Sequence, residues 1–285
     1  MGKLTLVDVS YVYSPDTPFE KEALTHVNID FKEKRTTGII GHTGSGKSTV
    51  AQLLNGLLRA SSGKVLLDGK DIFENPHEIG KIRFKVGLVF QYPEYQLFEE
   101  TVFRDIAYGP TNMGLDEGEI ERRVREAARF AGLDDDMLER SPFELSGGQK
   151  RRAAIAGVMA MEPEVIVLDE PAAGLDPRGR DEILSGVRRY REEKGNTVIL
   201  ISHSMEDMAL YSDELVVMSH GSVLVSGSVS QVFKEASLIE ESGLLLPQIT
   251  RVTDRLRRDG HALDSGIYTV ESAHEELLSL LKGQQ

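Results

Sequence analysis

A glycine-rich segment in the first fifth of the chain has the spacing of a loop that binds phosphate groups. It fits the pattern G-x-x-x-x-G-K-[ST] with Gly41, His42, Thr43, Gly44, Ser45, Gly46, Lys47 and Ser48, and Thr49 follows. The glycines let backbone N–H groups approach a polyanion, and a following helix directs the positive end of its dipole at it. We expect Lys47 to neutralise the β- and γ-phosphates of ATP and Ser48 to ligate Mg²⁺. The alternative, a turn with a solvated lysine, is disfavoured by the apolar strand before it and the helical pattern after it.

Two adjacent acids form a second candidate group. Asp169 and Glu170 follow four apolar residues at 165–168, which predict a buried strand. Open α/β sheets bind ligands at the carboxyl ends of their strands, so both side chains are expected there. Asp169 would hold Mg²⁺ through water, and Glu170 would orient or deprotonate the attacking water. In isolation, such a pair could equally be solvated.

Single polar residues follow two other apolar runs. His203 comes after residues 197–201 and is expected at the same sheet edge as the acids, near the γ-phosphate, although a lone histidine is more often structural. Gln91 comes after residues 86–90, and its amide is expected to ligate Mg²⁺ and the lytic water. Tyr13 could stack on adenine, although a single aromatic residue near the N-terminus lies in the core at least as often.

A pentapeptide near the middle of the chain is the most selective motif. It consists of Leu145, Ser146, Gly147, Gly148 and Gln149, and it precedes a helix predicted over residues 150–160. A helix start rich in N–H groups suits an anion. Because the pentapeptide belongs to a helical region, we expect that it cannot reach a nucleotide on its own phosphate loop. A second protomer facing head to tail would solve this geometry, with each ATP between one chain's loop and the other chain's residues 146–148.

The pattern along the chain predicts an α/β fold. Strands alternating with helices imply a mainly parallel sheet, and antiparallel strands are expected near the N-terminus at residues 4–9, 27–31 and 64–67. A helix is predicted from the phosphate loop through Leu58, stopped by residues 61–63. Residues 92–161 read as a helical insertion, with Gly132 as a helix cap. Beyond Gly243, two short amphipathic patterns predict a small helical appendage.

Composition narrows the functional classes. The 285 residues carry a net charge of -13, which disfavours a nucleic-acid surface, and three basic runs at 150–152, 188–189 and 255–258 are predicted to be solvated helix faces. There is no cysteine, which excludes disulfides and thiolate metal sites. Neither a signal peptide nor an apolar run approaching the roughly 20 residues of a membrane span is present. Any membrane association is therefore expected to come through partners.

Taken together, these motifs resemble the nucleotide-binding subunit of an ABC transporter. The resemblance covers residues 3–235 and includes the segment Ala173, Gly174, Leu175 and Asp176. It implies a P-loop NTPase (RecA-like) core with an N-terminal antiparallel β-subdomain, an inserted α-helical subdomain and a small C-terminal helical extension. It also implies that Asp176 makes contacts across a dimer and that His203 senses the γ-phosphate. Ala172 departs from the family, many members of which have Thr there.

Further motifs are similar to the ATPase (A component) of energy-coupling factor transporters, the A-prime type most of all. They are residues 91–98, 101–102, 105–110, 151–157 and 244–248. That resemblance implies ATP and Mg²⁺ as cofactors, a paralogous second ATPase rather than an identical one, and membrane T and S components that import vitamins or transition-metal ions. It places the chain at the cytoplasmic face of the membrane, with a cassette over 1–240 and a dimerisation extension over 241–285. The alternatives are an ordinary ABC transporter ATPase, a soluble non-transport ABC ATPase and a nucleotide-gated module without hydrolysis.

Overall fold

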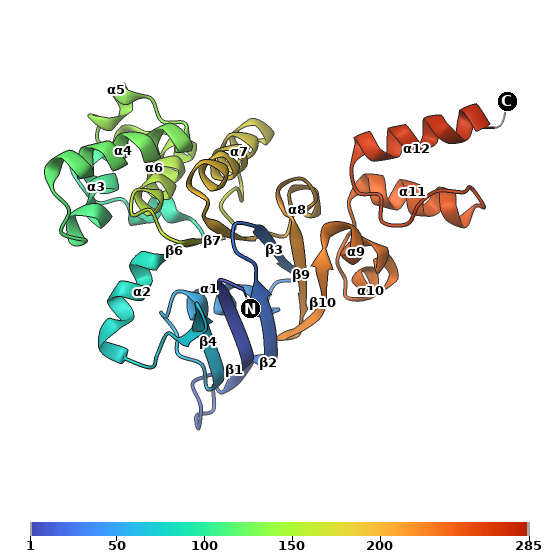
Figure 1. Ribbon diagram of the computed structural model, residues 1–285, viewed down its shortest axis with the longest axis horizontal. Coiled ribbons are helices and arrows are strands. Elements are labelled where there is room, and N and C mark those ends of the chain that lie inside the picture. The colour runs from blue at the N-terminus through green and yellow to red at the C-terminus, as the bar shows by residue number, and fades with distance from the viewer. Residues whose placement is uncertain (1, 284–285) are drawn as a thin grey trace.

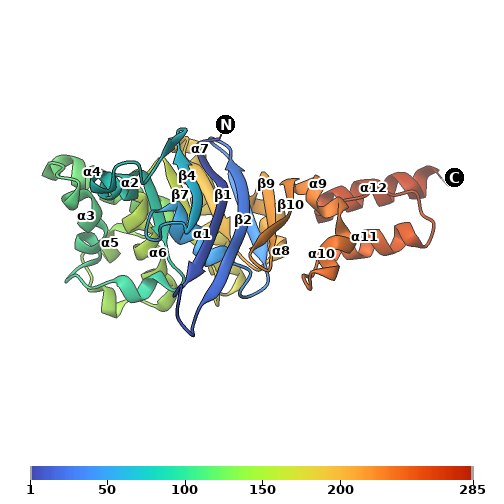
Figure 2. The ribbon, with the colours of Figure 1, turned by 90° about the horizontal axis from the view of Figure 1, so that it is seen from below.

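Two β-sheets, a cluster of helices and a helical C-terminal arm make up the molecule. The computed structural model describes residues 2–283. The sheets occupy the middle of an elongated molecule, the cluster α3–α6 lies at one end, and α11 and α12 lie at the other (Figure 1, Figure 2). Among the described residues, no helix has the length and apolarity needed to cross a membrane.

The N-terminal sheet is antiparallel, as predicted. Its strand order is β2-β1-β4-β5, with bounds Lys21–Phe31, Leu4–Tyr13, Ser62–Leu67 and Lys70–Asp71. Leu4 and Leu6 are buried at alternate positions of β1, and a shift of register at Asp8, which has φ of 51°, lets Val9 be buried too. This face covers α1 and one side of the second sheet, which closes the first hydrophobic core.

The second sheet has six strands in the order β10-β9-β3-β8-β7-β6. Their bounds are Ser222–Ser228, Glu214–Ser219, Thr36–Gly41, Thr197–Ile201, Val165–Asp169 and Val86–Val89. All neighbouring strands are parallel except β10 and β9. Successive residues of β7 belong to different cores, with Val167 beside α1 and Leu168 beside the helical cluster. Burial on both faces explains why these strands are apolar throughout.

Helix α1 (Lys47–Leu54) connects the phosphate loop to the first core. The helix predicted through Leu58 is wrong, because α1 ends at Leu54 with Asn55 as its C-terminal cap. The buried Asn55 amide donates a hydrogen bond to the carbonyl of Val86, and Gly56 follows with φ of 71°. Glycine adopts this backbone conformation readily, and the helix ends four residues before the predicted end at Leu58.

The helical insertion follows α2 (Ile79–Lys85) and β6. It contains α3 (Val102–Asn112), α4 (Glu117–Ala131), α5 (Asp135–Leu138) and α6 (Gly147–Met159), with single 3-10 turns at Pro93–Gln96 (η2) and Pro142–Glu144 (η3). Asp116 caps the start of α4 through the N–H of Glu119, at 3.0 Å. Gly132 ends α4 with φ of 70°, which confirms its predicted role.

Six helices follow β7 within residues 2–283. They are α7 (Pro177–Lys194), α8 (Met205–Tyr211), α9 (Val229–Lys234), α10 (Ala236–Glu241), α11 (Gln248–Arg258) and α12 (Val270–Gly283). The last two confirm the amphipathic patterns predicted beyond Gly243. They have a small core of their own, built on Leu263, Ile267 and Ala273. The arm therefore extends from the body on a core of its own, and only Leu244, Leu246 and Tyr268 of the described residues beyond Gly243 pack into a main core.

Candidate functional site

The phosphate loop lies between β3 and α1, in the strand–loop–helix context that its motif requires. Gly46 caps α1 with φ of 102°, and a Cβ added there would lie 2.5 Å from the Leu24 side chain. Gly44 has φ of 81° but open space around it. The Lys47 ammonium donates hydrogen bonds to the carbonyls of Gly41 (2.7 Å) and His42 (3.1 Å). The loop is thus already folded around its lysine.

Charged groups beside the loop are largely buried. Burial lowers the pKa of Lys47, against the opposing fields of Glu170 and Asp169. Burial also raises the pKa of Asp169, helped by the charge of Glu170 and opposed by a hydrogen bond from Ser48 and by Lys47. A hydroxyl and a carboxylate in contact are the hard oxygen donors that Mg²⁺ prefers. The donor set therefore fits Mg²⁺ bound to a triphosphate.

Glu170 and His203 meet at the carboxyl edge of the sheet, as predicted. The Glu170 carboxylate lies 2.9 and 3.0 Å from Nδ1 of His203. The Glu170 side chain is 12% exposed and that of His203 is 73% exposed, so the histidine forms the outer rim. The backbone of Glu170 has φ of 52°, and its N–H donates to the carbonyl of Ile201 on the neighbouring strand. This left-handed conformation turns the chain sharply after Asp169.

One cleft of about 230 Å³ collects most of the predicted nucleotide site. The predicted residues that line it are Tyr13, Thr43, Gly44, Gly46, Lys47, Ser48, Thr49, Gln91, Asp169 and Glu170. Gly41, His42 and Ser45 support the loop without lining this cleft. Lys21 and Ala23 also line it and were not predicted. Lys21 is cross-strand from Tyr13 in the β1–β2 pair, so only the strand register could have revealed it.

Tyr13 stands at the edge of this cleft. Its hydroxyl lies 3.1 Å from the Thr49 hydroxyl, and its ring meets that of Tyr11 edge to face at 4.8 Å. The ring is therefore oriented by the second residue after Lys47 and by its own strand. Its stacking on adenine stays a prediction.

The pentapeptide forms the start of α6. Ser146 accepts a hydrogen bond from the N–H of Gln149, and the Gln149 side chain accepts one from the N–H of Ser146 (2.9 Å). This reciprocal cap starts the helix at Gly147, so the predicted start at Lys150 is three residues late. Gly147 and Gly148 therefore lie inside the first turn of α6, where backbone N–H groups have no partner within the helix.

A second, larger cleft of about 860 Å³ contains the start of α6. Ser146 and Gly148 line it, together with Asp176, which caps α7 through the N–H of Gly179 at 2.8 Å. Gly147 and Gln149 flank these positions without lining the cleft. The two clefts share no lining residue. The pentapeptide and the chain's own phosphate loop thus line different clefts.

The basic run at 150–152 differs from its prediction. Arg151 is buried, with 4% of its surface exposed, and Arg152 is 19% exposed and paired with Glu182 at 2.6 Å. Consecutive helical residues point about 100° apart, so a run of three cannot occupy one solvated face. That geometry was the available signal that one arginine points inward.

Comparison with known proteins agrees with the geometry. The sequence profile described as "ABC transporter" matches residues 24–173. The chain belongs to the ABC transporter family. It is 50% identical over 280 residues to the energy-coupling factor transporter ATP-binding protein EcfA2 of Clostridium acetobutylicum, and 48% identical to that of Clostridium perfringens, with 98% of each chain covered in both cases. The predicted resemblance to energy-coupling factor ATPases is confirmed.

Solved structures of ABC ATPases superpose on this fold. The cbiO1 protein of Clostridium perfringens, part of the ABC transporter complex cbiONQ, is 39% identical, with a TM-score of 0.76 over 91% of this chain and 98% of that one. The cassette MJ0796, solved as a dimer with ADP and Pi, is 28% identical, with a TM-score of 0.71 over 79% and 98%. The predicted fold class is confirmed, and the chain is an ABC-family ATPase.

Proposed function

We propose that this ATPase drives an energy-coupling factor type importer by closing head to tail with a second ATPase around Mg-ATP. The separation of the two clefts carries the proposal. Lys47 and Glu170 line one of them, Ser146 and Gly148 line the other, and no residue is common to both. A second subunit would bring its own residues 146–148 to the phosphate loop of this one. ATP binding and pairing would then be one event.

Each polar residue of the first cleft has a defined task in this proposal. Lys47, now bonded to loop carbonyls, transfers its hydrogen bonds to the phosphates, and this compensates for its burial. Ser48, Asp169 and Gln91 would hold Mg²⁺, which neutralises phosphate charge when bound. Glu170 orients or deprotonates the attacking water.

His203 and Asp176 act around this centre. His203 contacts the γ-phosphate from the rim, where its imidazole already faces Glu170. Asp176 contributes from the second cleft to contacts across the dimer. Tyr13, which also lines the first cleft, stacks on adenine. These roles follow from placement in the two clefts and from the family resemblance.

The resemblance to energy-coupling factor ATPases suggests the rest of the assembly. The second ATPase would be a paralogue, and membrane T and S components would carry the vitamin or transition-metal ion, with this chain at the cytoplasmic face. The exposed aromatic side chains of Tyr92, Tyr95 and Phe98 offer the T component an apolar surface beside Gln91. Residues 1–240 would act as the cassette, with its helical subdomain at about 92–161, and residues 241–285 would help to hold the two ATPases together.

The pairing is tested with a hydrolysis-blocked variant. Glu170→Gln should retain Mg-ATP binding, and its mass by light scattering should rise to that of a pair on adding Mg-ATP, either for the chain alone or after mixing with a separately purified second ATPase. Turnover should fall by at least about 100-fold, because general base catalysis contributes roughly 10²–10⁴-fold. A second substitution, Gly148→Asp, should prevent pairing while leaving nucleotide binding intact. Pairing that survives Gly148→Asp on every subunit present would contradict the composite site.

A further inference from the structure

The guanidinium of Arg151 joins two segments that are far apart in the sequence. Its Nε and Nη2 donate to the two carboxylate oxygens of Glu94, at 3.0 and 2.7 Å, and its Nη1 donates to the carbonyl of Ala173. The planar fork of arginine fixes this geometry in a way that a lysine could not. Only 4% of the Arg151 surface is exposed, so water competes little for these bonds.

Ala173, which Arg151 contacts, is itself bonded to Glu170, the residue proposed to activate water. The N–H of Ala173 donates to the carbonyl of Glu170, at 3.2 Å, which makes residues 170–173 a closed turn. Glu170 holds its carboxylate toward His203 from a left-handed backbone conformation. Such a conformation persists only where its surroundings enforce it. Arg151 is bonded to this same turn, through the carbonyl of Ala173.

Glu94, the other partner of Arg151, belongs to a segment at the surface. Glu94 lies in η2, three residues after Gln91, and Arg151 lowers the pKa of its carboxyl although burial opposes this. The neighbouring Tyr92 and Tyr95 are 47% and 84% exposed, and the Tyr92 ring centroid lies 5.7 Å from the Arg151 guanidinium. Residues 92–96 are thus attached to Arg151 on one side and exposed on the other.

We infer that Arg151 is a positioning residue for ATP hydrolysis, which transmits a displacement of residues 92–96 through the carbonyl of Ala173 to Glu170. The inference rests on the role proposed for Glu170, and it does not depend on which protein binds the exposed aromatic residues. Contact at this surface changes the rate of hydrolysis and leaves ATP affinity unchanged. The reason is that none of Arg151, Glu94 and Ala173 lines the cleft of the phosphate loop.

A purely structural role for Arg151 makes a different prediction. If the Arg151–Glu94 pair only held α6 against η2, any substitution restoring the pair would restore activity. Exchange of the two charges, E94R/R151E, separates these roles. The carboxylate introduced at position 151 can pair with an arginine at position 94, but it has no N–H to donate to Ala173.

The experiment uses the full-length chain together with the subunits that co-purify with it. Arg151→Lys and Glu94→Gln should lower kcat about tenfold and leave KM for Mg-ATP within about twofold, since small misplacements near the reacting groups cost up to 10²-fold in rate. E94R/R151E should recover the thermal midpoint lost by Arg151→Glu without recovering kcat. Hydrogen exchange should quicken at 92–98 and 171–176 in Arg151→Lys, and stay unchanged at 41–49.

Arg123→Lys is the matched control. Arg123 is also mostly buried, and it also bonds carboxylates and a backbone carbonyl, those of Glu119, Glu162 and Met161. Its kcat should equal that of the parent.

Glu170→Gln gives the background rate, and parental turnover in that variant would instead refute the role proposed for Glu170. If Glu170→Gln is inactive while folded Arg151→Lys and Glu94→Gln keep kcat within twofold of the parent, the inference alone is overturned. Recovery of kcat in E94R/R151E would also overturn it. If the variants that change Arg151 fail to fold, the kcat of Glu94→Gln decides whether the inference stands.

Discussion

At the scale of single residues, Lys47 is expected to contribute little to the stability of the fold and much to the binding of Mg-ATP. Its side chain is partly buried, and this burial lowers its pKa, so the folded state holds this proton less tightly than the unfolded chain does. By linkage, the lysine disfavours folding below its folded-state pKa, and this effect is lost as the pH rises from that value to the unfolded-state value of 10.5. Against this, its two bonds to loop carbonyls stabilise the loop.

Lys47→Met should therefore change the free energy of unfolding by no more than about 1 kcal/mol, because these two effects offset one another. The same substitution should weaken Mg-ATP binding by roughly 10- to 150-fold, the equivalent of a charged hydrogen bond of about 1.5–3 kcal/mol. Thermal unfolding with and without Mg-ATP measures both. Lys32→Met, which removes a surface ion pair with Glu214, is the control and should keep the full nucleotide-induced shift. A Lys47→Met protein with parental affinity would contradict the assignment.

How far the sequence predicts the site depends on whether a residue lies within a local motif. Lys47, Ser48, Asp169 and Glu170 were predicted because loop and strand patterns fix their neighbours along the chain. Lys21 and Arg151 were not, because their partners lie across a strand pair and in a segment 57 residues away. Such contacts depend on tertiary register, which periodicity does not report.

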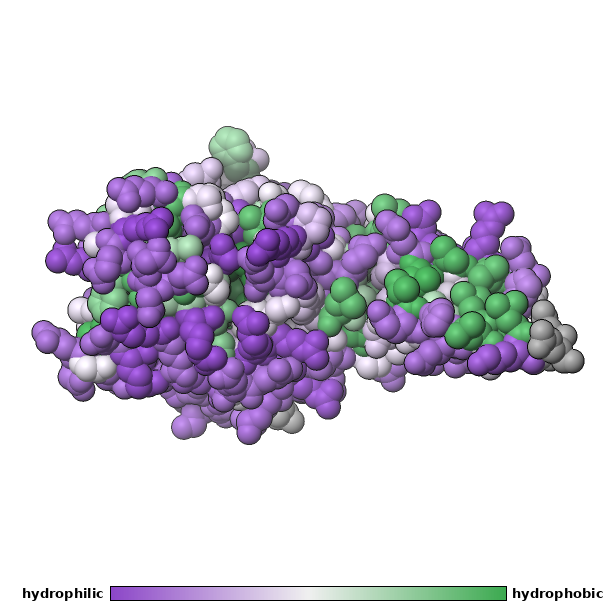
Figure 3. All heavy atoms as spheres, turned by 90° about the horizontal axis from the view of Figure 1, so that it is seen from above, coloured by the Kyte–Doolittle hydropathy of each residue, from purple (hydrophilic) through white to green (hydrophobic). Residues whose placement is uncertain are grey.

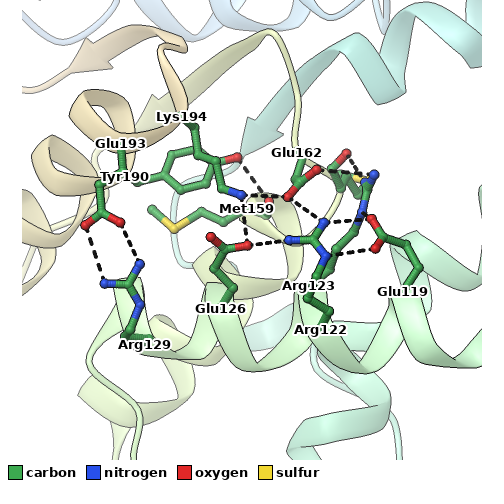
Figure 4. Close-up of polar contacts among 11 residues, drawn as sticks. Glu119, Arg122, Arg123, Glu126, Arg129, Met159, Glu162, Tyr190, Glu193 and Lys194 are labelled. Atoms are coloured by element: carbon green, nitrogen blue, oxygen red, sulfur yellow. Dashed lines mark hydrogen bonds and ion pairs between the residues drawn. The ribbon is translucent and has the colours of Figure 1, made fainter.

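At the scale of elements, the orientation of the helical cluster depends on a group of ion pairs centred on Glu162 (Figure 4). Glu162 lies after α6 with φ of 51°, and its carboxylate contacts Arg122 and Arg123 of α4 (both 3.2 Å) and Lys194 of α7 (2.9 Å). Lys194 also reaches Glu126, at 2.8 Å. The cluster therefore ties the end of α7 in the core to the middle of α4.

Glu162→Gln should lower the free energy of unfolding by about 2 kcal/mol at neutral pH, as expected for a mostly buried, charge-assisted contact. Lys194, Arg123 and Arg122 lower the pKa of Glu162 below its usual 4.5, although burial opposes them. Its stabilisation is thus present above pH 4.5 and is lost as the pH falls through the lower, folded-state value. Urea unfolding measures this: the difference in free energy of unfolding between Glu162→Gln and the parent should be smaller at acidic pH than at neutral pH.

Glu121→Gln provides the comparison for this effect. Glu121 lies on the exposed side of α4, 57% exposed, and pairs with Arg125 one turn away. Loss of this ion pair should lower the free energy of unfolding by less than about 0.5 kcal/mol, the usual contribution of an exposed pair within a helix. Equal destabilisation by the two substitutions would show that the Glu162 cluster has no special role.

The sequence predicts the existence and type of most elements better than their ends. The buried strands and the helical insertion followed from hydrophobic periodicity, whereas α1 ended early, capped by Asn55, and α6 began early, capped by Ser146. Both ends are determined by side-chain hydrogen bonds, one of them to a distant strand. Periodicity records which face of an element is buried, and it does not record where a polar side chain ends the element.

At the scale of the whole molecule, the C-terminal arm is set apart from the site. It lies at the opposite end from the helical cluster, and hydrophobic side chains gather on its surface (Figure 2, Figure 3). The exposed ones are Leu245 (71%), Val252 (52%), Val270 (65%), Leu278 (39%) and Leu281 (65%). Apolar groups on an arm with so small a core of its own are typical of a surface that binds another chain.

The proposed role of residues 241–285 in holding two ATPases together makes these side chains the test. Val252→Glu combined with Leu281→Glu should weaken pairing at least about tenfold, since each buried aliphatic side chain contributes roughly 1.5–3 kcal/mol. Mg-ATP binding by the free chain should stay unchanged, because the arm is remote from both clefts. Sedimentation of the chain with its co-purified ATPase, across a concentration series, measures the pairing. Val7→Glu, on the N-terminal sheet and 40% exposed, controls for added charge and should pair as the parent does. Parental pairing by the double variant would remove the arm from the interface and leave nucleotide closure as the only force joining the subunits.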